Sequence, residues 1–475
     1  MTDTSLDPAD WDAFRAAAHD ALDRALGRLQ HVAEGPVWRP TPDAVRQRFA
    51  APLPRGPREL TDVLDDVDAL IAPFVVGNTH PRFLGWAHGA GAPVGVVAEL
   101  IAAALNANCG GRDHIGPVVE RQIATWAAEA FGFPTASSGV FVTGASQANF
   151  LGLLIARDAA LGHDVRAAGL RGAAQLCAYA STEAHACVRQ AAELAGVGSD
   201  FLRTVETDAE GRMRLDVLSA AVDRDRAAGL RPFLVVGTAG GVNFGAFDDL
   251  QALAPLAEAA GLWLHVDGAF GALTTLAPAL APLTKGLARA DSVAFDFHKW
   301  AHAPYDAGFL LVRDPAAHKG TFAAPAAYLS RLPRGLAAGG DWPCDYGPDL
   351  SRGFRALKVW MTLQTLGADA IGAAIAANCA AARRLAALVA ASGVFELAAP
   401  VPLNIVCFAL RGDAEGALSA ELAMRLQERG LAAPSTTRIA GRQVVRAAIF
   451  NHRTTVADID RFFADASRVA AELSR

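Results

Sequence analysis

The chain has 475 residues, of which 52% are hydrophobic and 19% are charged, and its formal net charge is -6 because 43 Lys and Arg face 49 Asp and Glu. The acidic balance excludes nucleic-acid binding driven by bulk charge, and the apolar content excludes a disordered chain. At roughly 100 to 200 residues per domain, the length predicts one large domain with smaller appendages in a soluble globular protein.

The start of the chain and the cysteines favour a cytoplasmic protein. The segment 1–14 is acidic and lacks the basic and apolar regions of a secretory signal, and the most apolar stretches are too short for a membrane span or carry a charge. The 6 cysteines form no CxxC pair and no Cys/His cluster at zinc spacing. We therefore expect reduced thiols, mostly in the core, and no metal site.

Residues 1–77 are predicted to form an N-terminal helical arm. Two helical runs, the second ending at about Pro73, are joined by a Pro-rich connector. Helices with so little core of their own must lay their apolar faces on the main domain or on a partner subunit. A homodimer would satisfy that requirement.

Residues 78–350 are predicted to form the large domain. Short, almost continuously apolar runs alternate there with Ala/Leu-rich helices, which is typical of parallel strands covered on both faces. The predicted architecture is three-layered α/β with a mainly parallel sheet. The strand candidates are 138–144, 174–181, 231–238, 262–267, 290–297 and 307–314.

A long loop and a small domain are predicted for the rest of the chain. Residues from about 322 to 349 lack helix or strand periodicity, and loops of this length are usually functional or disordered. Residues 351–475 begin with a helix and add Ala-rich helices with two strand candidates, at 403–411 and 443–450. We expect a smaller α+β domain there.

The first candidate site lies where the strand at 138–144 meets a helix through Gly144, Ala145 and Ser146. A helix N-terminus offers unpaired N–H donors and a partial positive charge, which together hold a phosphate, and a Ser hydroxyl would add one bond. Two alternatives stay open at this point. Ser146 could simply cap the helix, or it could be a nucleophile, since the segment is one residue away from G-x-S-x-G.

Two further candidates follow later strands. Asp267 ends the strand at 262–267, at the edge where open α/β sheets bind ligands, and a helix cap is the alternative role. Lys299, beside His298, directly follows the strand at 290–297. Because desolvation lowers the pKa of a lysine, Lys299 could be a nucleophile, although a purely structural lysine is the alternative.

Together these residues match the attachments that pyridoxal phosphate (PLP) requires. A phosphate cradle, a strand-end carboxylate for the pyridine nitrogen and a buried lysine for the aldehyde carbon would meet at one edge of the sheet. His185, after the strand at 174–181, could stack on the cofactor ring, although a lone histidine is more often structural.

At this point the chain resembles the group II PLP-dependent amino-acid decarboxylases, which include aromatic-L-amino-acid and glutamate decarboxylases. The resemblance implies a fold-type I, PLP-dependent transferase-like protein with a mainly parallel seven-stranded sheet, and a homodimer with active sites at the interface. The matching segments are NTHPRFLGW, SGVFVTGASQANFLGLLIARD, STEAHACV, GLWLHVDGAFGA, ADSVAFDFHKW and SRGFRALKVW, between about residues 78 and 360.

The resemblance also implies roles for individual residues. Lys299 would be the Schiff-base lysine, Asp267 the partner of the pyridine nitrogen and His185 the stacking histidine. The residues implied near the cofactor are Ala145, Ser146, Ala269 and His298.

The chain departs from the family pattern at three places. Asp296 stands where the family often has Asn, which argues against a phosphate role for it, and Ala239 stands where aromatic decarboxylases usually have Thr. The tyrosine that protonates the carbanion in that family has no clean counterpart, and Tyr346 is the nearest candidate. We expect the loop at about 322–349 to close over the substrate and to supply this group.

The leading prediction is decarboxylation of an L-amino acid to the amine and carbon dioxide, the substrate being aromatic or similar. A decarboxylating aldehyde synthase is the related alternative. A serine hydrolase built from Ser146, Asp267 and His298 and a catalytically silent binding protein are unrelated ones. For the substrate pocket we predict Trp86, His88 and Asp113, unless Asp113 merely pairs with Arg112.

Overall fold

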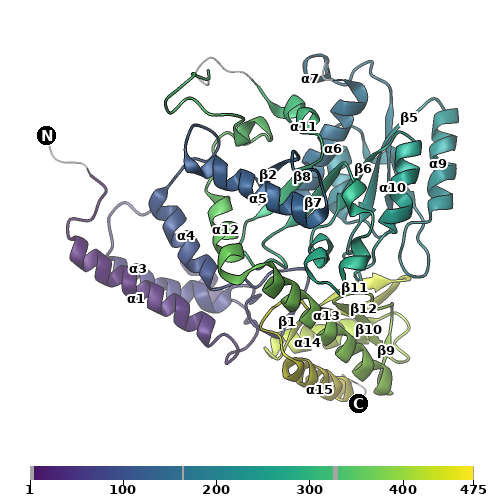
Figure 1. Ribbon diagram of the computed structural model, residues 1–475. Helices are drawn as coiled ribbons and strands as arrows, with labels where there is room; N and C mark the ends of the chain where they lie inside the picture. The colour runs from purple at the N-terminus through teal and green to yellow at the C-terminus, as the bar shows by residue number, and fades with distance from the viewer. Residues whose placement is uncertain (1–4, 163–164, 325–329, 474–475) are drawn as a thin grey trace.

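The computed structural model in Figure 1 describes residues 5–162, 165–324 and 330–473, and a seven-stranded sheet forms its centre. The strand order is β2-β8-β7-β6-β5-β3-β4. Strands β3 to β7 pair in parallel, and β8 is antiparallel to both β7 and β2. All strands except β8 therefore run in one direction. Their bounds are β2 Ser138–Val142, β3 Leu176–Ser181, β4 Leu202–Val205, β5 Arg231–Thr238, β6 Trp263–Asp267, β7 Ser292–Asp296 and β8 Gly308–Val312.

Helices cover both faces of this sheet, which explains why its strands are apolar without alternation. On β2, Val140 and Val142 pack against α6, whereas Phe141 points to the opposite face and belongs to the same core cluster as Phe131 of α5. The central strands β3, β7 and β8 are buried at every position. The helices of this body are α4 Val94–Leu105, α5 Ile115–Phe131, α6 Ala145–Leu161, α7 Val165–Ala168, α8 Ala186–Leu194, α9 Leu215–Ala227, α10 Leu250–Ala259, α11 Pro315–Phe322 and α12 Arg355–Leu366.

The C-terminal part forms a second sheet below the first in Figure 1, with the order β1-β11-β12-β10-β9. Its first strand comes from the N-terminal side of the large domain, because Phe83 and Leu84 pair in parallel with β11. Strand β1 therefore lies within the predicted large domain (78–350) along the sequence, but it is part of the sheet of the predicted small domain (351–475) in the structure. The bounds are β1 Phe83–Leu84, α13 Ala368–Ala391, β9 Phe395–Leu397, β10 Ile405–Leu410, α14 Ala417–Glu428, β11 Ala433–Ile439, β12 Arg442–Ala448 and α15 Val456–Leu473.

The N-terminal arm consists of α1 (Trp11–Gln30), α2 (Asp43–Arg48) and α3 (Leu60–Asp66), and none of these helices has a buried residue. Figure 1 shows α1 and α3 extending from the body on the left. Arg24 links the two runs through ion pairs with Asp65 and Asp68.

Among the described residues, α13 is the one helix long and apolar enough to cross a membrane. It packs against the small sheet and α15, and its buried residues include Ile375, Asn378 and Leu385. Gly372 lets it approach the large domain closely, because a Cβ at this position would lie 1.9 Å from the carbonyl oxygen of Leu276. Its contacts are those of a core helix between the two sheets.

The sequence predicted six strands of the large sheet within a few residues and missed β4, a short edge strand with one exposed position. In the small sheet it missed β1, β9 and β11. Two regular elements lie in or beside the predicted loop at 322–349, since α11 ends at Phe322 and a 3-10 helix spans Pro343–Asp345.

Candidate active site

A cavity of about 490 Å³ lies at the carboxyl edge of the large sheet. Residues after β2, β3, β5, β6 and β7 line it, because these strands run in the same direction and end at the same edge. Trp86, His88 and the segment 435–437 close its other side. The structure thus brings together nine predicted site residues, namely Trp86, His88, Ala145, Ser146, His185, Asp267, Ala269, His298 and Lys299.

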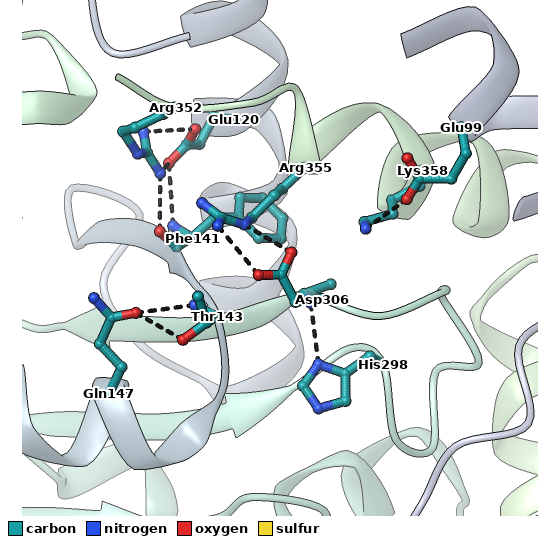
Figure 2. Close-up of polar contacts among 11 residues, drawn as sticks. Glu99, Glu120, Phe141, Thr143, Gln147, His298, Asp306, Arg352, Arg355 and Lys358 are labelled. Carbon is teal, nitrogen blue, oxygen red and sulfur yellow. Dashed lines mark hydrogen bonds and ion pairs between the residues drawn. The ribbon is translucent and has the colours of Figure 1, made fainter. Parts of the chain in front are cut away.

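The N-terminus of α6 faces this cavity. The N-cap residue is Gly144, no side chain bonds the first turn from the cap, and Ser146 is the second residue inside the helix. The capping role considered for Ser146 is therefore wrong. Gln147 instead folds back on Thr143, whose N–H and hydroxyl both donate to its Oε1 at 3.0 Å (Figure 2). Ser146 and the first turn of α6 form a cradle for an anion, in which the N–H of Ala145 already donates to Asp296.

Asp296 lies between the cradle and the lysine. Its Oδ1 accepts the N–H of Ala145 at 2.7 Å, and its Oδ2 lies 2.9 Å from Lys299 Nζ. Burial would lower the pKa of Lys299, but the charges of Asp296 and Asp267 outweigh it and raise that pKa above its usual value. The expectation that Lys299 has a lowered pKa is therefore wrong in this arrangement, because the sequence could not show how close Asp296 lies.

Asp267 is buried at the end of β6, where one oxygen accepts the N–H of Ala269 at 3.2 Å. Burial raises its pKa, and the neighbouring charge of Lys299 opposes this shift. A buried carboxylate that has so few hydrogen bonds and faces a cavity can bind a cationic N–H group.

The two histidines are held through their Nδ1 atoms. His185 is the N-cap of α8, and its Nδ1 accepts the N–H of Cys187 at 3.2 Å. His298 Nδ1 accepts the N–H of Ala307 at 3.0 Å, and burial lowers the pKa of His298 to about 4. Both rings are therefore neutral when they accept these bonds, with the proton on Nε2.

Two arginines of the segment SRGFRALKVW bond the strand and the loop that lead to cavity residues (Figure 2). Arg352 pairs with Glu120 at 2.6 Å, and both side chains bond the backbone of Phe141 in β2. Arg355 makes two bonds, at 3.0 and 3.1 Å, to the carboxylate of Asp306 in the β7–β8 connection. These pairs fix the strand and the loop that carry the cavity residues.

Two predicted site residues do not line the cavity. Asp113 is exposed and forms no ion pair with Arg112, whose guanidinium lies 4.8 Å from the ring of Trp342. Tyr346 packs against His318, and its hydroxyl donates to Asp341 at 2.7 Å. Their roles in substrate binding and proton transfer stay predictions, without support from these positions.

Among the cavity residues that the sequence reasoning missed, three bear on the chemistry. Thr238 ends β5, and its buried hydroxyl has no partner among the described residues. Tyr305 follows Lys299 by six positions on the same connection. Arg446 is a buried cation whose bonds go to Ser435 and to backbone carbonyls rather than to a carboxylate. The strand-end argument could have found Thr238, but no local pattern marks the other two.

The residues present fit PLP. The cradle at Ser146, the free hydroxyl of Thr238, the buried carboxylate of Asp267 and the amine of Lys299 border one cavity. The hydrolase arrangement does not form, because the bonds of His298 go to Ala307 and toward Asp296, at 3.6 Å, rather than to Ser146.

Comparisons with known proteins agree with this fit. The Pyridoxal-dependent decarboxylase conserved domain matches residues 42–411. An aromatic-L-amino-acid decarboxylase of Bacillus atrophaeus is 28% identical over 98% of this chain and 96% of its own length. A 3,4-dihydroxyphenylacetaldehyde synthase of Drosophila melanogaster is 28% identical over 94% of this chain and 89% of its own length. The structure of Oryza sativa TDC with PLP and tryptamine superposes with a TM-score of 0.90, at 25% identity, over 99% of this chain and 100% of the other.

Proposed function

The chain belongs to the pyridoxal-dependent decarboxylase family and is a PLP-dependent amino-acid decarboxylase, and we propose that its substrate is an aromatic L-amino acid and its product the amine. The observation that carries the substrate proposal is an aromatic wall in and beside the cavity. The rings of Phe83, Trp86 and His88 pack against one another, with ring centroids 5.7 Å from His88 to each of the other two and 6.1 Å between Phe83 and Trp86. Such a wall favours a flat, apolar side chain.

The charges around the cavity support the same substrate class. Of the two lining carboxylates, Asp296 pairs with Lys299 and Asp267 would bind the pyridine nitrogen of PLP, so neither is left for a basic substrate side chain. Arg446 has no carboxylate partner among the described residues, and one hydrogen on Nη2 is not used by its bonds, so it can attract the carboxylate of the amino acid.

Different residues of the cavity would hold different parts of PLP. Ser146 with the N-terminus of α6 would hold the phosphate, Asp267 would keep a proton on the pyridine nitrogen, and Lys299 would bind the aldehyde carbon. His185, with its proton on Nε2, would cover the ring. When bound, PLP supplies the electron sink for the bond that breaks at the carboxylate.

A decarboxylating aldehyde synthase is the second candidate. Its support is the similarity to the Drosophila aldehyde synthase and the position of Tyr346, whose phenol bonds Asp341 instead of facing the cavity. An aldehyde product requires dioxygen and releases ammonia and hydrogen peroxide, whereas the amine product requires neither oxidant nor reductant.

The test is a screen of the PLP-loaded protein with L-phenylalanine, L-tyrosine, L-tryptophan, L-glutamate and L-leucine, measuring carbon dioxide, amine and peroxide. We expect carbon dioxide and amine from an aromatic substrate, and a higher KM in Trp86→Ala. Turnover of glutamate alone would contradict the aromatic assignment, and stoichiometric peroxide would favour the aldehyde synthase.

We also propose that the protein is a homodimer. Apolar side chains are exposed on three neighbouring elements, among them Trp11 and Phe14 of α1, Val63 of α3, and Leu100 and Leu105 of α4. A second copy would cover this surface, since exposed apolar patches of this kind mark interaction sites.

Light scattering tests the dimer. Leu100→Glu should halve the molecular mass in solution, whereas the control Leu194→Glu, at an exposed leucine of α8, should leave it unchanged. A monomeric parent protein would contradict the proposal. Cytoplasmic location stays a prediction.

A further inference from the structure

We propose that Tyr305 returns the proton to the substrate carbon after carbon dioxide has left. The assignment deepens the proposed decarboxylation and rests on it. Tyr305 is a cavity residue without a role so far, and among the described tyrosines it is the one that lines the cavity.

The position of Tyr305 suits a late catalytic group. It lies in the connection from β7 to β8 that also carries Lys299, and it is 48% exposed although it belongs to a well-packed segment. Its ring lies 4.2 Å from the ring of His298 and 6.3 Å from that of His88, between the lysine side of the cavity and the aromatic wall. A substrate held against that wall would meet this phenol.

The hydrogen bonding of Tyr305 leaves its proton available. The hydroxyl oxygen accepts the N–H of Gly89 at 3.3 Å, and no described acceptor takes its hydrogen. Burial raises the pKa of the phenol, with the N–H of Gly89 and the charge of Lys299 opposing this shift. The group therefore keeps its proton through neutral pH and can donate it. Gly89 is needed here because a Cβ would lie 1.7 Å from the carbonyl oxygen of His298.

The segment around Tyr305 is fixed on its C-terminal side. Asp306 makes two bonds to Arg355, and the N–H of Ala307 donates to His298 Nδ1 (Figure 2). A rigid phenol costs little entropy to place over a reacting carbon, which is what general acid catalysis requires.

The rival acids are placed less well. The Tyr346 phenol is tied to Asp341, and its ring packs on His318 outside the cavity lining. His185 lines the cavity as a neutral imidazole, whose Nε2–H is a weaker acid than a phenol.

The proposed step conserves atoms and electrons. The O–H bond of Tyr305 breaks, and a C–H bond forms with the electron pair that the departing carboxylate leaves on the substrate carbon. The phenolate then takes a proton from water. No oxidant or reductant is consumed, and the amine is the product.

The experiment compares Tyr305→Phe with Tyr346→Phe, the same substitution outside the cavity, in the PLP-loaded protein with its best aromatic substrate. We expect Tyr305→Phe to slow amine formation by about 10²- to 10⁴-fold and to keep a burst of about one carbon dioxide per site. Tyr346→Phe should form amine at the parental rate. PLP affinity of the cofactor-free protein, followed by absorbance, should be the same in all three proteins.

Amine formation at the parental rate in Tyr305→Phe, or slowing in Tyr346→Phe alone, would overturn the assignment. So would a loss of PLP affinity in Tyr305→Phe, because it would indicate a structural role. Carbon dioxide release by the parent protein separates these results from failure of the proposed function. A parent protein that releases none from any aromatic amino acid would overturn both.

Discussion

The buried pair of Arg352 and Glu120 gives a prediction that joins stability to the site. The side chains of Arg352 and Glu120 are 2% and 6% exposed, and together they bond both backbone groups of Phe141 in β2. Strand β2 continues into the cradle at Ser146. Replacing Arg352 by Met leaves the carboxylate of Glu120 buried without its cation. The variant should therefore be less stable, and its cradle should bind PLP less tightly.

The expected cost of Arg352→Met is about 3–5 kcal/mol of the free energy of unfolding, the range for breaking one side of a buried ion pair. At about 2.1 cal/mol/K of unfolding entropy per residue, a chain of 475 residues loses roughly 3–5 °C in Tm. In the double variant Glu120→Gln/Arg352→Met no charge is stranded, and the amide still accepts the N–H of Phe141. Its cost should fall to about 1–3 kcal/mol, for the carbonyl of Phe141 left unpaired.

Thermal and urea unfolding measure these costs, and PLP affinity reports on the cradle. The control is Arg384→Met, which breaks the exposed pair with Asp460 and should cost less than about 1 kcal/mol. The reasoning is refuted if Arg352→Met costs no more than Arg384→Met, or if the double variant is less stable than the single one.

Four other predictions address the site and the response to pH. Lys299→Ala should abolish turnover and the covalent linkage, and borohydride reduction with peptide mapping would contradict the site if PLP were found on another lysine. Asp267→Ala should keep its circular dichroism spectrum but lose about 10- to 150-fold in turnover, for a charge-assisted bond of about 1.5–3 kcal/mol, and near-normal turnover would argue against its role. Asp296→Asn should tighten PLP binding about 5- to 50-fold by removing a negative charge from the phosphate cradle, and weaker binding in an absorbance titration would show that the carboxylate helps. His265 and His318 have pKa values lowered to about 3 by burial, so the unfolded chain takes up protons that the folded chain cannot. The free energy of unfolding should therefore fall as the pH drops below about 6.5, and His265→Gln should reduce that fall in urea titrations at about pH 7 and pH 5.

Most of the fold followed from local patterns in the sequence. Buried parallel strands are almost continuously apolar, and each ends at a residue with a distinct chemistry, as β6 ends at Asp267 and β7 leads into Lys299. Because such strands end at one edge, the site could be placed before any distance was known. The edge strand β4 and the pairing of β1 with β11 lack that signal, since they depend on neighbours far along the chain.

What the sequence could not provide is distance. The sequence pointed to Tyr346 as the acid and did not mark Tyr305, 41 positions earlier, yet the phenol of Tyr346 bonds Asp341 and the phenol of Tyr305 lines the cavity. The same holds for the charge on Lys299. A lysine after an apolar strand suggests a lowered pKa, but a carboxylate 2.9 Å away reverses the sign. In a buried site a separation of a few ångströms is worth several kcal/mol, and it decides whether a group holds, donates or accepts a proton.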